Sequence, residues 1–156
     1  MSLLMPLLKP GTPAPAFRLL DQHGRSIGLD DFSGQKSLVL LFFASDWLPG
    51  DLRLLKTYAD AYPRFRESGI EVLALSAINW ESLHNLGHRL QIPFPLLFDV
   101  SCRAAKPYQA MWLPKFITGR AVYAINPSGE IVLPAHVVTP KAILEALKPW
   151  SGEAVG

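Results

Sequence analysis

The sequence predicts an α/β fold in which helices cover both faces of a mixed β-sheet. Two apolar runs without polar alternation, 37–44 and 70–76, are typical of central strands that are buried on both faces. Segments of helical periodicity follow both runs, and this alternation indicates a sheet with packed helices. Hydrophobic residues are 49% and charged residues 18% of the 156 residues, which excludes a disordered chain and predicts one well-filled domain.

The N-terminal part predicts an extended segment and then a β-hairpin. Residues 1–10 are expected to be extended, since prolines recur at their end and just beyond. A strand over 17–20, a turn at 21–24 and a second arm over 26–29 complete the hairpin. Residues 30–34 are predicted to form a turn or a single helical turn.

The middle of the chain predicts two helices and a short strand. Apolar residues spaced by three and four predict a helix from Asp51 to about Glu67. Pro63 lies inside this helix and is expected to kink it or to start a new turn. A second helix is predicted over 80–90, and a short strand over 94–98.

The C-terminal part predicts two further helices and a hairpin. A short helix is expected from Ser101 to Gln109, with Ser101 as its N-cap. Strands over 120–125 and 130–133 flank an Asn-Pro-Ser-Gly turn and form a hairpin. A last helix begins at Thr139–Pro140 and ends near residue 150.

Composition excludes several classes of function. The net charge is only +2 and the basic residues are scattered, so no nucleic-acid partner is predicted. Cys102 is the one cysteine, which excludes an internal disulfide and a four-cysteine zinc site. The N-terminus does not match a signal peptide well, and no apolar run reaches the roughly 20 residues of a membrane span. We therefore predict a cytoplasmic protein without membrane association, cofactor or metal, either monomeric or homodimeric.

Four segments together carry a family pattern. They are GTPAPAF at 11–17, LVLLFFASDWLPGD at 38–51, IPFPLLFDVSCRAAKPYQA at 92–110 and RAVYAINPSGEIV at 120–132. They resemble the AhpC/TSA peroxiredoxins, and most of all the bacterioferritin-comigratory and Q-type subgroup. The resemblance spans residues 10 to 150. It implies a thioredoxin-like fold, with residues 1–156 forming a single domain.

The resemblance also implies where the active loop lies. In this family a Pro-x-x-x-Thr-x-x-Cys loop reduces peroxide: the Cys attacks, and the Thr hydroxyl and an Arg hold the oxygens. In this chain the Cys position falls on Asp51, the Thr position on Leu48 and the Pro position on Ala44. The resolving Cys of the Q-type subgroup falls on Lys56. The family's arginine is retained as Arg120.

These replacements predict a loss of the family's chemistry. Peroxide reduction needs a thiolate that takes oxygen onto its sulfur, and the Asp51 carboxylate has no such reaction. The Leu48 side chain offers no hydrogen bond. The sequence therefore predicts a peroxiredoxin-like protein that acts as a binding or regulatory module. The alternative is an atypical antioxidant oxidoreductase that uses the thiol of Cys102.

Each candidate residue also has a purely structural interpretation. Asp51 is a first-turn carboxylate that accepts free N–H groups, a partner of Arg120 in place of the thiolate, or both; a general base is the further alternative. Arg120 is a solvated strand-end cation, or it faces the pocket that is the active site in the family and binds a small anion or a protein partner there. Cys102 is a small core residue or a thiol whose pKa is lowered at a helix N-terminus.

Two other features carry weaker functional hypotheses. His84 and His88 share a helix face, which is typical of a solvated surface, and HNLGH lacks the glutamate of the zinc-protease motif. The apolar stretch Met111–Phe116 is predicted to be a loop over the sheet edge. It either packs there or forms a partner surface.

Overall fold

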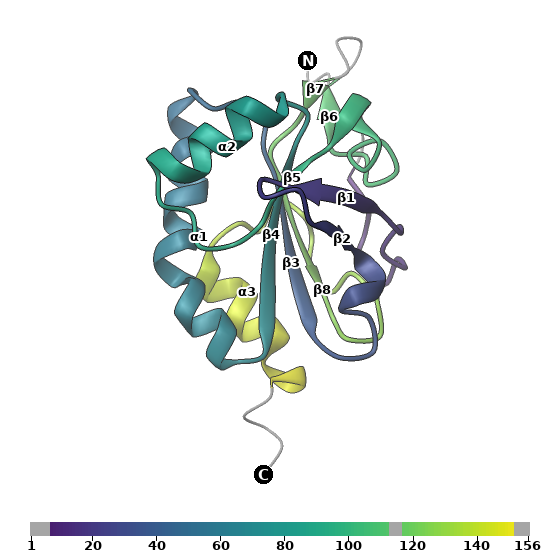
Figure 1. Cartoon of the computed structure of the whole chain (residues 1–156). Coiled ribbons are helices and arrows are strands. Elements are labelled where there is room, and N and C mark those ends of the chain that lie inside the picture. Colours follow the sequence, from purple (N-terminus) through teal and green to yellow (C-terminus); the bar gives the residue numbers. More distant parts are fainter. Residues whose placement is uncertain (1–6, 113–116, 152–156) are drawn as a thin grey trace.

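The computed structural model describes residues 7–112 and 117–151 (Figure 1). Residues 1–6 of the expected extended segment and 113–116 of the expected apolar loop therefore lie outside the described residues.

Within the described residues, six strands form one mixed sheet in the order β2-β1-β5-β4-β3-β8. The parallel core consists of β3, β4 and β5, whereas β8 pairs with β3, β1 with β5 and β2 with β1 in antiparallel directions. The strands are β1 (Arg18–Asp21), β2 (Ser26–Gly28), β3 (Ser37–Phe42), β4 (Ile70–Ser76), β5 (Leu96–Phe98) and β8 (Ala121–Ile125). A separate pair is formed by β6 (Met111–Trp112) and β7 (Ile117–Thr118).

The described α-helices are α1 (Pro49–Glu67), α2 (Trp80–Arg89) and α3 (Pro140–Leu147), and the 3-10 turns are η1 (Leu29–Asp31), η2 (Val100–Cys102) and η3 (Lys148–Trp150). The expected α/β thioredoxin-like fold is confirmed, with its mixed sheet and its N-terminal hairpin β1–β2. No new helix begins at Pro63, because α1 runs through it as a single helix.

The central strand β3 is buried along its whole length and divides the core into two layers. Because successive side chains of a strand point to opposite faces, Val39 and Leu41 pack with α1, α2 and α3. Leu38 and Leu40 pack with the N-terminal segment and with residues 102–110. Figure 1 shows the three α-helices on one side of the sheet. All three described α-helices therefore cover one face, whereas the sequence predicted helices on both faces; irregular chain and 3-10 turns cover the opposite face.

The absence of the helix predicted from Ser101 to Gln109 explains this asymmetry, because residues 102–110 pack on the face without α-helices. Ser101 and Cys102 both have a φ of 55°, in the left-handed region that interrupts an α-helix. The Asp99 carboxylate instead accepts the backbone N–H groups of Ala104 (2.6 Å) and Ala105 (2.8 Å). The segment therefore folds as a 3-10 turn followed by further turns, and Ser101 does not cap a helix.

Two smaller expectations also change. The second arm of the C-terminal hairpin, expected over 130–133, is reduced to single bridges that join Ile131 to Ile125 and Glu130 to Pro13. The stretch expected as an apolar loop contributes Met111–Trp112 to a strand pair with Ile117–Thr118, so its described ends form an antiparallel ladder.

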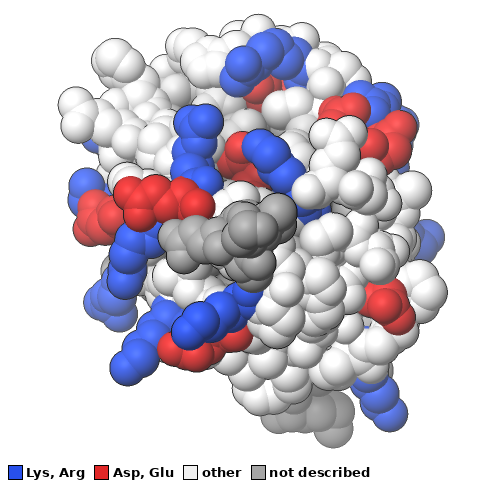
Figure 2. All heavy atoms as spheres, turned by 90° about the horizontal axis from the view of Figure 1, so that it is seen from below, with Lys and Arg blue, Asp and Glu red and all other residues white. Residues whose placement is uncertain are grey.

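No helix in the described ranges is long and apolar enough to cross a membrane. On the face that Figure 2 displays, acidic and basic side chains lie next to one another rather than in a patch of one sign.

Candidate functional site

The loop that follows β3 builds the candidate site. Residues 43–48 leave the sheet at the carboxyl end of a parallel strand, and α1 begins with Pro49 at its first position. Proline suits this position because its fixed φ fits a helix and its missing N–H would have no helical partner. Leu48 is the N-cap residue and has an extended backbone without a side-chain cap. The free N–H groups at this helix end therefore need other acceptors.

The Asp51 carboxylate lies in the first turn of α1 and closes the loop. Its side chain is only 1% exposed. One oxygen, Oδ2, accepts the N–H groups of Ala44 (3.2 Å) and Ser45 (3.0 Å) and the Ser45 hydroxyl (3.2 Å). The other oxygen, Oδ1, accepts Nε of Arg120 at 2.7 Å. Both oxygens of this buried carboxylate are thus engaged.

Ser45 is a site residue that the sequence reasoning missed. Its hydroxyl donates to Asp51 and accepts the N–H group of Leu48 at 3.0 Å. It thereby satisfies the N–H group of the N-cap residue itself, one of the free groups at the start of α1. The available signal was a serine three residues before the N-cap, in a loop where side-chain-to-backbone hydrogen bonds are common.

Arg120 reaches the site from the residue before β8. Its Nε is bound to Asp51, while its side chain remains 44% exposed. The guanidinium lies on the backbone of Gly50: a Cβ at residue 50 would meet Nη2 at 2.5 Å. Glycine at this position therefore permits the close approach. The expectation that Arg120 faces the same pocket as Asp51 is confirmed by this contact, and the guanidinium is at the same time partly exposed to solvent.

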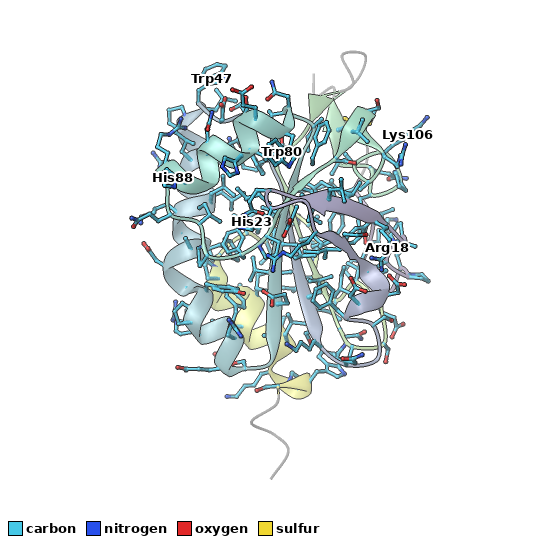
Figure 3. The ribbon with its side chains drawn as sticks, viewed as in Figure 1. Arg18, His23, Trp47, Trp80, His88 and Lys106 are labelled. Atoms are coloured by element: carbon cyan, nitrogen blue, oxygen red, sulfur yellow. The ribbon has the colours of Figure 1, made fainter. Side chains whose placement is uncertain are left out.

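The other residues to which the resemblance assigned a role, and the neighbouring Trp47, make only structural contacts or are exposed to solvent. Ala44 and Leu48 are half-buried, and the backbone N–H of each bonds to the loop. Lys56 lies on the exposed surface of α1, where its Nζ is 3.6 Å from the Asp60 carboxylate. Trp47 is 69% exposed and projects from the upper edge of the molecule in Figure 3.

Cys102 lies in the core layer on the face opposite the α-helices. It is 2% exposed, and its Sγ lies 3.9 Å from Oγ1 of Thr118. Burial raises the pKa of the Cys102 thiol. Burial and the absence of an α-helix at this segment do not favour a thiol with a lowered pKa, and the surroundings fit a small core residue.

Three of the four histidines, His23, His84 and His88, line a separate surface cavity of about 310 Å³. His84 places its Nδ1 3.3 Å from the carbonyl oxygen of Gln22 and stacks on Trp80, with ring centres 5.4 Å apart. His23 and His88 contribute to the same cavity, on the side of the molecule facing the viewer in Figure 3. In the part of the chain that the structure describes, no group of three or more His, Cys, Asp or Glu side chains could hold a metal ion.

Fold and site together define a class: a thioredoxin-fold protein with a carboxylate–guanidinium pair at the first turn of the helix that follows the central strand. The sequence profile of the AhpC/TSA family matches residues 10–133. The chain belongs to the AhpC/TSA family, as the sequence predicted.

The curated relatives are peroxiredoxins of the Q type. The chain is 31% identical over 124 residues to chloroplastic peroxiredoxin Q of Sedum lineare, covering 79% of this chain and 66% of that protein. It is 30% identical over 122 residues to chloroplastic peroxiredoxin Q of Oryza sativa subsp. japonica, covering 78% and 56%. The chain therefore spans between half and two thirds of the length of these relatives.

Solved structures show the same fold. The peroxidoxin BcpB of Mycobacterium tuberculosis is 18% identical with a TM-score of 0.78, and the match covers 96% of this chain and 99% of that one. The bacterioferritin comigratory protein of Xanthomonas campestris is 22% identical with a TM-score of 0.74, covering 93% and 98%. At these identities the likeness concerns the fold.

Proposed function

We propose that this protein does not reduce peroxides and acts as a binding or regulatory module, with the Asp51–Arg120 pair in place of the family's thiolate. The single observation that carries the proposal is the Asp51 carboxylate itself. It lies at the start of the helix after the central strand, buried, with its four donors coming from Ala44, Ser45 and Arg120. An ion pair at this position supplies the negative charge but not the reactive sulfur.

The chemistry of the loop supports this proposal. Thiol peroxidases pass through a sulfenic acid, in which sulfur has taken an oxygen atom from the peroxide. A carboxylate oxygen has no such reaction. Leu48 stands where the resemblance implies a threonine, and its side chain cannot donate a hydrogen bond to a bound oxygen.

A role for Asp51 as general base receives no support from its surroundings. A general base needs a free lone pair within about 3 Å of the proton that it removes. Oδ2 of Asp51 already accepts three hydrogen bonds, and Oδ1 accepts Nε of Arg120. The carboxylate is also buried, so a substrate would have to displace these donors first.

The alternative oxidoreductase function through Cys102 is also weakly supported. The nucleophile in such chemistry is the thiolate, and burial raises the pKa of the Cys102 thiol. The thiol is therefore protonated at neutral pH. We expect iodoacetamide to label Cys102 only when the protein is unfolded; rapid labelling of the native protein at pH 7 would favour the alternative.

We propose the cytoplasm as the location, because a single cysteine fits a reducing compartment. The relatives named above are chloroplastic. A fluorescent fusion expressed in the source cell distinguishes the two.

The direct test is turnover of hydrogen peroxide and an alkyl hydroperoxide with thioredoxin or dithiothreitol as reductant. The protein and its Cys102→Ser variant are both expected to match the rate of the reductant alone. Saturable turnover that disappears in Cys102→Ser would contradict the proposal and assign the chemistry to that thiol.

A restoration series tests the assignment of the loop positions. The variants are Asp51→Cys, Asp51→Cys with Leu48→Thr, and the same pair with Ala44→Pro; Asp51→Ser is a control of similar size without a thiol. We expect peroxide reactivity to rise through the series, because orientation and transition-state hydrogen bonds each contribute several kcal/mol in well-formed sites. A folded triple variant that reacts no faster than Asp51→Cys would show that the loop positions are wrongly assigned.

A further inference from the structure

We propose that the outer side of the Asp51–Arg120 pair forms a binding pocket for a small organic monocarboxylate. The proposal rests on the proposed role as a binding module and gives that role a ligand class. The pocket has a volume of about 280 Å³ and lies between the first turns of α1 and the residues that lead into α3. We call it the Arg53–Arg120 pocket after its two cationic side chains.

The helix α1 supplies one wall through its geometry. Residues 50, 53, 54 and 57 are three or four apart, so they lie on one helix face, and all four line the pocket. Figure 1 shows α1 and α3 on the same side of the sheet, so the segment entering α3 closes the opposite wall. Arg120 enters from the residue before β8, with its guanidinium lying on Gly50. Three separate parts of the chain therefore meet around this pocket.

The polar side chains that line the pocket are hydrogen-bond donors, and each is either positively charged or neutral. Arg53 and Arg120 are the titratable residues in the described lining, which contains no acidic side chain. Nε of Arg120 is bound to Asp51, whereas within residues 7–112 and 117–151 neither its Nη atoms nor the Arg53 guanidinium has an acceptor. Because Asp51 balances the charge of Arg120, the pocket keeps the charge of Arg53, which matches a monoanion.

Two threonine hydroxyls complete the donor set. Thr57 lies one turn after Arg53 on α1, and Thr139 is the N-cap residue of α3. Thr139 Oγ1 accepts the N–H group of Ala142 at 3.4 Å, which leaves its hydroxyl hydrogen available for a ligand oxygen. An anion in this pocket would thus meet guanidinium and hydroxyl donors together.

The rest of the lining is apolar and selects the kind of anion. Leu54 and Val138 form the apolar wall, and Val138 is 37% exposed. Pockets of this size are at the lower end of those that hold small molecules, so the ligand has only a few carbon atoms. Guanidinium groups bind carboxylates through paired N–H donors. A short aliphatic or small aromatic monocarboxylate can bind the guanidinium groups through its carboxylate and contact the apolar wall through its carbon atoms. Inorganic phosphate can bind only the guanidinium groups.

The experiment is a calorimetric titration of the full chain with butyrate, benzoate and inorganic phosphate as separate probes. We expect saturable binding of the two carboxylates, with phosphate at least tenfold weaker. Arg53→Gln should weaken carboxylate binding about tenfold, the effect of one charge-assisted hydrogen bond. Lys56→Gln removes a neighbouring exposed cation of α1 outside the pocket and serves as the matched control. It should bind as the unchanged protein does.

The apolar wall has its own test. Val138→Ala removes apolar surface from the wall without adding a donor, and should weaken butyrate binding about fourfold, about the equivalent of one buried methyl group. The same change should leave phosphate binding unaltered. Absence of carboxylate binding at millimolar concentration, phosphate binding as tight as butyrate, or unchanged affinity in Arg53→Gln would each overturn the pocket.

Failure here is distinguishable from failure of the proposed function. Background peroxide turnover without carboxylate binding overturns the pocket alone. Saturable peroxide turnover together with carboxylate binding overturns the proposed loss of peroxidase activity and leaves the pocket in place.

Discussion

Asp21 and Asp51 are two buried carboxylates that accept hydrogen bonds from nearly the same kinds of donor group. Asp21 Oδ1 accepts the N–H groups of His23 (2.9 Å) and Arg25 (2.8 Å), and its Oδ2 accepts Nε of Arg25 at 2.9 Å. Asp51 likewise accepts two backbone N–H groups and one arginine Nε, and adds the Ser45 hydroxyl. In each case the carboxylate is buried, whereas the arginine is partly exposed at Asp51 and largely exposed at Asp21.

The two sites differ in where their donors come from. All donors to Asp21 lie within four residues, in the turn of the β1–β2 hairpin. Arg120 is 69 residues from Asp51, and the other donors come from the loop that leaves β3. Asp21 therefore fixes a turn, whereas Asp51 joins the end of one strand, the start of a helix and the approach to another strand. Similar sets of hydrogen bonds therefore stabilise a local turn at Asp21 and a contact between distant parts of the chain at Asp51.

The largest expected effect is that of Asp51→Ala on stability. The substitution leaves two loop N–H groups without an acceptor and separates Arg120 from its partner. Unsatisfied buried donors and a broken, partly exposed ion pair together predict a loss of about 3 kcal/mol in the free energy of unfolding. Urea denaturation followed by circular dichroism measures it. A loss below about 1 kcal/mol would show that the loop readily exposes these groups to water.

Asp21→Ala should cost less, about 1–2 kcal/mol, although it removes a similar set of hydrogen bonds. The hairpin turn is at the surface, so water can reach the N–H groups of His23 and Arg25 once the carboxylate is gone. The same urea experiment provides the comparison. Equal losses for Asp21→Ala and Asp51→Ala would remove the distinction between the local and the long-range site.

Double-mutant cycles isolate the two arginine contacts. Asp51→Asn with Arg120→Gln should give a coupling free energy of about 1 kcal/mol, and Asp21→Asn with Arg25→Gln about 0.5 kcal/mol or less. The arginine side chain is 44% exposed in the first pair and 66% exposed in the second, so solvent screens the second more. A larger coupling in the hairpin would show that exposure does not rank these pairs.

The smallest expected effect concerns a third pair, Asp31 with Arg18, which lies at the surface. The N–H group of Gly28 and then Arg18 lower the pKa of Asp31. A lowered folded pKa contributes stability above the unfolded value of about 3.9, and this contribution is lost as pH falls through the folded value. The difference in Tm between the protein and Asp31→Asn should therefore shrink between pH 6 and pH 2.5. A constant difference would mean that the charge of Asp31 contributes nothing.

Local patterns predicted the strands well, because the uninterrupted apolar runs of β3 and β4 have few other solutions. The helix expected at Ser101–Gln109 failed, since Asp99 captures the N–H groups of Ala104 and Ala105 in a way that depends on the surrounding core. The pairing of Asp51 with Arg120 came from resemblance alone, as the two are far apart in sequence. Ser45 was missed because its role depends on the folded path of the loop.

Because Gly50 has no side chain, its backbone limits which side chains fit at position 120. A flat group fits against that backbone, and a Cβ at residue 50 would meet the guanidinium carbon at 2.7 Å. A lysine would carry the same charge, but its ammonium is tetrahedral and has no flat side to lay on the peptide. It also lacks a donor in the place of Nε, from which Asp51 takes its hydrogen bond. Position 120 therefore requires the planar shape and the Nε donor of arginine in addition to its positive charge.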